Sequence, residues 1–138
     1  MTLVLDTSAL VRRYVHAPGR DLVLGTMADD GDWCASALAP TETLVLLHRL
    51  ALHPAEQEAL WRAAREDFEA LWVVPVDGRC LARATEIAAT YGTRTIDAVH
   101  LAAADRLPRP LRYCTFDRRQ IPAAAGLGFE VITPLMAD

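Results

Sequence analysis

Short apolar runs separated by longer helical patterns constrain the fold of this chain more than any other feature. Each run is only four to six residues long and carries few polar side chains, as in strands that are buried on both faces. The predicted strands cover residues 2–5, 33–37, 72–76, 111–116 and 129–133.

The segments between these runs have the periodicity and the end signals of helices. Thr7 or Ser8 is expected to cap the first helix, and Pro40 lies near the start of the third. The predicted helices cover residues 7–14, 20–30, 41–52, 54–71, 78–92, 93–107 and 118–126. This alternation predicts a three-layer α/β/α domain with a mostly parallel central sheet of about five strands. With no linker in 138 residues, we expect a single domain over residues 1–138.

Four carboxylates occur where such a fold binds ligands. Asp6 follows the first predicted strand and Asp117 follows the fourth, while Glu42 and Asp97 fall in the first turns of predicted helices. Open parallel sheets bind ligands beyond the carboxyl ends of their strands, so all four side chains can line one edge. Taken singly, each has an ordinary alternative as a turn residue or as a favourable charge near a helix start.

A shared site of this kind needs positive charge, because converging carboxylates repel one another. The chain contains no lysine, no CxxC pair and no HxxxH or HExxH motif. Oxygen ligands alone favour Mg²⁺ or Mn²⁺, which many enzymes use to cleave phosphodiester bonds. The net charge of −4 argues against a nucleic-acid partner, but setting aside four metal-binding acids leaves equal numbers of acidic and basic residues.

In order and spacing, four stretches resemble the motifs of PIN-domain ribonucleases, and most of all those of VapC-type toxins from bacterial toxin–antitoxin pairs. The resemblance runs from residue 3 to residue 134, and the stretches are VLDTSALVRRY, TETL, TIDAVHLAAA and TFDRRQIPAAAGLGFEVITP. It implies a PIN fold and a metal-dependent endoribonuclease that leaves 5′-phosphate and 3′-hydroxyl ends. The implied partners are RNA, a cognate antitoxin protein and a second copy of the chain in a homodimer.

The same resemblance assigns the site residues. It implies that Asp6, Glu42, Asp97 and Asp117 are catalytic and hold the metal, and that Ser8 and Thr115 support them.

Other residues near these motifs have two open interpretations. His100 lies three residues after Asp97, so it is either a metal ligand or a packed, hydrogen-bonded side chain. Four arginines follow the first and fourth strands, where they either contact an RNA backbone or form solvated surface: Arg12, Arg13, Arg118 and Arg119.

Rival functions fit the sequence less well. A phosphoaspartyl receiver needs a lysine, and a haloacid-dehalogenase-type phosphatase needs an aspartate where Ser8 stands. The remaining alternative is a catalytically silent PIN fold that binds RNA or a partner protein.

The composition also predicts where the protein is found. No apolar run approaches the ~18 residues of a membrane span, and the first residues lack the basic start of a signal peptide. Three scattered cysteines indicate free thiols in a reducing compartment, so we expect a cytoplasmic protein with no membrane association.

Residues 41–61 carry more apolar side chains than a single core stripe needs. Either these side chains border a groove for an amphipathic antitoxin helix, or they pack against the domain's own helices. The candidates are Leu44, Leu47, Leu50, Leu52 and Trp61.

Overall fold

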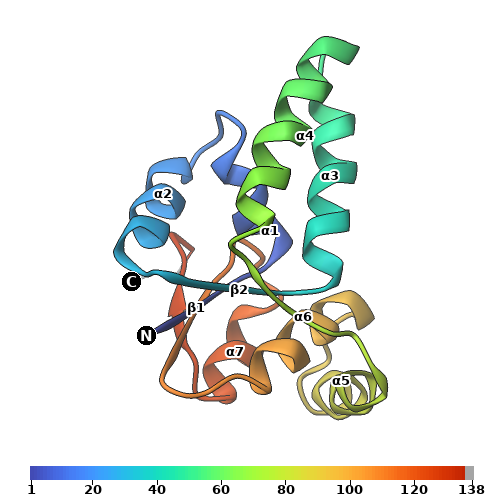
Figure 1. Cartoon of the computed structure of the whole chain (residues 1–138). Coiled ribbons are helices and arrows are strands. Elements are labelled where there is room, and N and C mark those ends of the chain that lie inside the picture. The colour runs from blue at the N-terminus through green and yellow to red at the C-terminus, as the bar shows by residue number, and fades with distance from the viewer. Residues whose placement is uncertain (136–138) are drawn as a thin grey trace.

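A five-stranded, fully parallel sheet forms the centre of the protein (Figure 1). The computed structural model describes residues 1–135, so the last three residues of the predicted domain lie outside the described part. The strand order is β3-β2-β1-β4-β5. The strands are β1 (Thr2–Leu5), β2 (Asp32–Ser36), β3 (Trp72–Val74), β4 (Leu111–Cys114) and β5 (Glu130–Ile132).

Helices cover both faces of this sheet, which confirms the predicted three-layer α/β/α arrangement (Figure 1). One face carries α1 (Thr7–Leu10), the 3₁₀ turn η1 (Val11–Arg13), α2 (Arg20–Asp29), and a long hairpin of α3 (Leu38–Leu50) and α4 (Pro54–Phe68). The other face carries α5 (Gly78–Tyr91), α6 (Thr95–Asp105) and α7 (Ile121–Gly126). Within residues 1–135, no helix combines the length and apolarity needed to cross a membrane.

The central strand is buried on both faces, as its apolar sequence predicts. Leu3 and Leu5 pack with Leu10 and Val23 on the side of α1 and α2. Val4 points to the opposite layer and packs into the cluster that α5, α6 and α7 form. Because successive strand side chains alternate between faces, a four-residue strand can join two separate apolar cores.

The beginnings of two helices differ from the sequence predictions. Asp6, and not Thr7 or Ser8, caps α1 by accepting a hydrogen bond from the Ala9 N–H. The α-helix then ends at Leu10 and tightens into η1, so the predicted helix through Tyr14 is wrong in its second half. Helix α3 begins at Leu38, three residues before the predicted start, which places Glu42 in the second turn and not in the first.

The α3–α4 hairpin uses most of its apolar side chains internally. Leu47 is fully buried, Leu44 and Trp61 pack beside it, and the Trp61 indole N–H donates to the Leu44 carbonyl at 2.9 Å. Of the two predicted alternatives, packing against the domain's own helices therefore describes Leu44, Leu47 and Trp61. Leu50 and Leu52, near the tip of the hairpin, are exposed.

All three cysteines are free and buried, which gives a first testable prediction. Burial raises the pKa of the Cys34 thiol to about 11 and that of Cys114 to about 12. Because only the thiolate reacts, we expect the native protein at pH 8 to react with a disulfide reagent at least about tenfold more slowly than the unfolded chain. Absorbance titration in buffer and in denaturant measures this difference, and a fast-reacting thiol in the native state would contradict it.

Candidate functional site

The candidate site lies at the carboxyl ends of β1, β2 and β4. Strand β1 is the point at which the strand order reverses, because β2 and β3 lie on one side of it and β4 and β5 on the other. Ligands of open α/β sheets bind in the crevice outside such a switch point. Asp6 follows β1 directly, and Thr115 follows β4.

Three donors hold the Asp6 carboxylate in place. The Ser8 hydroxyl donates to Oδ1 at 2.7 Å, the Thr115 hydroxyl donates to Oδ2 at 2.7 Å, and the Ala9 N–H donates to Oδ1 at 3.0 Å. Burial raises the pKa of Asp6, although these hydrogen bonds act in the opposite direction. The carboxylate is thus fixed and buried, and a nearby cation would stabilise its ionised form.

Ser8 and Thr115 also fix the loop that carries Asp117. The Phe116 N–H donates to the Ser8 hydroxyl at 2.8 Å, and the Asp117 N–H donates to the Thr115 hydroxyl at 3.0 Å. Asp117 lies three residues beyond the end of β4, because the strand ends at Cys114 and not at the predicted residue 116, and its side chain is partly exposed.

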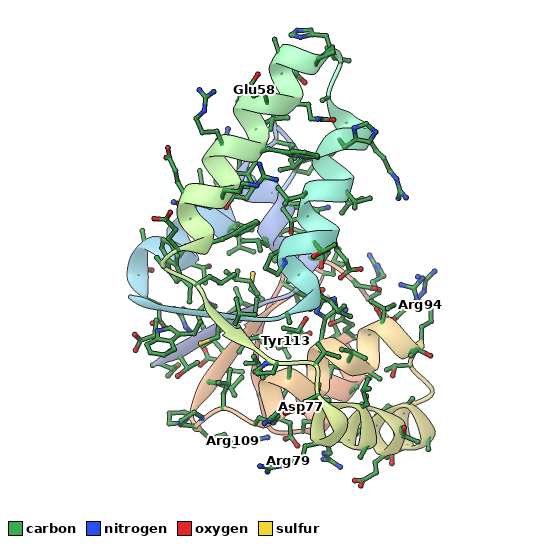
Figure 2. The ribbon with its side chains drawn as sticks, turned by 45° about the vertical axis from the view of Figure 1, so that its right-hand side comes forward. Glu58, Asp77, Arg79, Arg94, Arg109 and Tyr113 are labelled. Carbon is green, nitrogen blue, oxygen red and sulfur yellow. The ribbon has the colours of Figure 1, made fainter. Side chains whose placement is uncertain are left out.

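Asp97 occupies the first turn of α6, as predicted, and its side chain is only 3% exposed. The Gln120 amide donates to Oδ1 at 3.2 Å, and the Arg94 guanidinium donates to Oδ2 at 3.0 Å. Gln120 is in turn oriented by the hydroxyl of buried Tyr113, which donates to its side-chain oxygen at 2.5 Å. Figure 2 shows Tyr113 inside the molecule and Arg94 at the surface.

Glu42 is held by other residues than those that hold Asp6 and Asp97. The Thr7 hydroxyl donates to Oε1 at 2.7 Å, and His100 Nε2 lies 2.7 Å from the same oxygen. The hydrogen bond with His100 is the main reason why the pKa of Glu42 is lowered. The other His100 nitrogen, Nδ1, pairs with the Ser36 hydroxyl at 2.8 Å, so His100 is a packed, hydrogen-bonded residue that positions Glu42.

These carboxylates share one region without forming a closed ligand cage. Burial is the main reason why the pKa of Tyr113 is raised, and the negative charges of Asp6, Asp97 and Asp117 raise it further. The charge of Asp97 also opposes ionisation of Glu42. In residues 1–135, however, no group of three His, Cys, Asp or Glu side chains is close enough to hold one metal ion as it stands. The donor chemistry still fits a hard divalent cation, because all four side chains offer oxygen and two of them are buried.

The four candidate arginines divide into two pairs. Arg12 stacks on Phe116 at 4.1 Å and donates to the Pro18 carbonyl, while Arg13 pairs with Asp67 at 2.7 Å. The side chains of Arg12 and Arg13 therefore make contacts within the domain. Arg118 and Arg119, by contrast, are exposed beside Asp117.

Sequence reasoning missed four residues of this site. The Arg94–Asp97 pair has the three-residue spacing of neighbours on a helix, which is a signal that sequence alone offers. No local pattern points to the others, because their contacts span 23 residues or more: Thr7, Ser36 and Gln120.

Comparisons with known proteins test the resemblance that the sequence motifs indicate. The PIN domain family model matches residues 3–126. The chain is 35% identical to Ribonuclease VapC46 of Mycobacterium tuberculosis over 133 residues, which are 96% of this chain and 97% of that protein.

Solved structures share the fold. A toxin–antitoxin complex from Klebsiella pneumoniae superposes with a TM-score of 0.71 at 18% identity, over 99% of this chain and 100% of that chain. VapBC-5 from Mycobacterium tuberculosis, a member of the VapBC family of toxin–antitoxin systems, gives a TM-score of 0.60 at 21% identity, over 96% and 98%.

Proposed function

Because the chain belongs to the PIN domain family, we propose that it is a metal-dependent endoribonuclease and the toxin of a toxin–antitoxin pair. The observation that carries this proposal is the set of four carboxylates at the switch point of the sheet, each held by its own hydrogen bonds. The similarity to a VapC ribonuclease over almost the whole chain supports the same activity.

In this proposal, the side chains that would hold Mg²⁺ or Mn²⁺ are those of Asp6, Glu42, Asp97 and Asp117. When bound, such an ion supplies the charge that activates water for in-line attack on phosphorus and that stabilises the leaving 3′ oxygen. The protein's own contribution is to fix its carboxylates: Ser8 and Thr115 hold Asp6, Gln120 holds Asp97, and His100 holds Glu42. Fixed ligands need little reorganisation when the reaction begins.

RNA then binds across the open side of this edge. Arg118 and Arg119 are exposed next to Asp117, where their guanidinium groups can pair with backbone phosphates. Arg12 and Arg13 are already engaged within the domain, so we assign them no direct role in RNA binding.

The alternative is a silent PIN fold that binds RNA or protein without cutting. The presence of four carboxylates with their supporting hydroxyl groups favours the enzyme, because a binding module needs no such cluster. The discriminating experiment is controlled expression in a bacterial host. We expect growth arrest with the natural chain and normal growth with Asp97→Asn at equal protein level, whereas equal growth in both cases would favour the silent fold.

We propose that the toxin is a symmetric homodimer, because dimers with twofold symmetry are the commonest closed assemblies. We also propose that a segment of the antitoxin binds at the tip of the α3–α4 hairpin. A hollow of about 530 Å³ lies between the end of η1 and the hairpin, and its apolar lining includes Val15, Leu50, Leu52 and Leu60. Its size and its apolar lining suit one face of an amphipathic helix. A structural neighbour that is a toxin–antitoxin complex supports an antitoxin as the partner.

Leu52 tests this surface, because it is 85% exposed and contributes little to the core. We expect Leu52→Asp to weaken binding of the cognate antitoxin at least about tenfold in calorimetry, with RNA cleavage unchanged. Leu81→Asp is the matched control, since Leu81 is an exposed leucine on α5, on the other side of the sheet. Unchanged affinity in Leu52→Asp would remove this surface from the interface.

A further inference from the structure

Arg94 connects two of the carboxylates that the proposed function assigns to the metal. Its Nε and Nη2 atoms lie 3.0 and 3.4 Å from the Asp97 carboxylate, and Nη2 also lies 3.4 Å from Asp117. In residues 1–135, no other arginine or histidine forms an ion pair with either aspartate. One guanidinium therefore forms ion pairs with both carboxylates.

The position of Arg94 at the start of a helix is unfavourable for a cation. It is the N-cap residue of α6, and its side chain makes no capping hydrogen bond. A positive charge at a helix N-terminus opposes the helix dipole. The two carboxylates are the interaction that offsets this cost, which indicates that Arg94 serves the site and not the helix.

The Arg94 contacts also use the oxygens that a metal ion would need. Both Asp97 oxygens accept hydrogen bonds from the guanidinium. A divalent cation at the same oxygens would compete for their lone pairs and would repel the guanidinium. The side chain of Arg94 is 60% exposed, so it can swing into solvent without disturbing the core, and Gln120 still holds Asp97.

We propose that Arg94 is a built-in counterion that a divalent cation displaces from Asp97 and Asp117, and that it thereby lowers the affinity of the site for metal. This inference rests on the proposed function, which makes both aspartates metal ligands. It accounts for a set of oxygen donors that is chemically suited to the ion but not assembled around one. Without metal, Arg94 screens the repulsion between the two carboxylates.

The test is a calorimetric titration of the purified protein with Mn²⁺. We expect Arg94→Gln to bind Mn²⁺ about tenfold more tightly than the natural chain, which corresponds to about 1.4 kcal/mol. Arg94→Lys keeps the charge but loses the planar fork, so we expect an intermediate affinity. Arg79→Gln is the control for the net charge change, because Arg79 is exposed on α5 at a distance from Arg94 (Figure 2).

The outcomes distinguish a failure of the proposed metal site from a failure of the role of Arg94. If the natural chain binds Mn²⁺ and Asp97→Asn abolishes that binding, the metal site stands; equal or weaker binding by Arg94→Gln then overturns the role of Arg94 alone. If neither the natural chain nor Arg94→Gln binds Mn²⁺, both the metal site and the counterion role fail. A crystal structure with Mn²⁺ gives a second readout, in which a guanidinium still bound to both Asp97 oxygens would overturn the displacement.

Discussion

Replacement of Asp97 by asparagine is expected to lower RNA cleavage at least about 100-fold while the protein remains folded. The change removes one negative charge and keeps the shape of the side chain, and Gln120 can still hydrogen-bond to the amide oxygen. Loss of a charged ligand weakens both metal binding and the field at the scissile phosphate. The measurement is the initial rate of RNA cleavage at saturating Mg²⁺, with protein concentrations matched.

The control for this variant is Asp21→Asn, which alters an exposed aspartate in the first turn of α2. It changes the same charge at an equivalent helix position but lies outside the carboxylate cluster, so its cleavage rate should equal that of the natural chain. We expect the unfolding temperature of metal-free Asp97→Asn to stay within about 4 °C of the natural value. Cleavage at the natural rate by Asp97→Asn would show that its assignment as a ligand is wrong.

Removal of divalent metal is the second change with a large expected effect. We expect excess EDTA to abolish cleavage and added Mg²⁺ or Mn²⁺ to restore it, because the four carboxylates cannot supply positive charge to the transition state. Circular dichroism should change little, since three apolar clusters and a five-stranded sheet hold the fold. Undiminished cleavage in EDTA would contradict the assigned chemistry, and unfolding in EDTA would instead make the metal structural.

The sheet could be predicted from sequence because its strands are local apolar runs. Strand β1 coincides with the predicted residues 2–5, since the buried run stops abruptly at Asp6. Asp97 could be placed in the first turn of α6 because an isolated charge interrupts an alanine-rich apolar pattern. Both features depend on neighbours in the sequence, which is the information that a pattern contains.

The features that the sequence analysis misplaced either lack a local signal or depend on contacts between distant segments. Helix α3 begins at Leu38 with Ala37 as its N-cap and no side-chain cap, so no Ser, Thr, Asp or Asn marks its start. The burial of Leu47 arises from packing against α4, not from its own sequence pattern. The link from Tyr113 through Gln120 to Asp97 joins a strand, a loop and a helix, and only the folded chain brings them together.

The chemistry of the product ends tests the central claim most directly. Purified protein is incubated with cellular RNA and Mg²⁺, and the ends of the fragments are identified by mass spectrometry and by ligation that requires a 5′-phosphate. Because water attacks phosphorus in the proposed reaction, the fragments should carry 5′-phosphate and 3′-hydroxyl ends, and Asp97→Asn should yield none. Fragments with 2′,3′-cyclic phosphate and 5′-hydroxyl ends would show that the ribose hydroxyl attacks instead, and would contradict a hydrolytic carboxylate site.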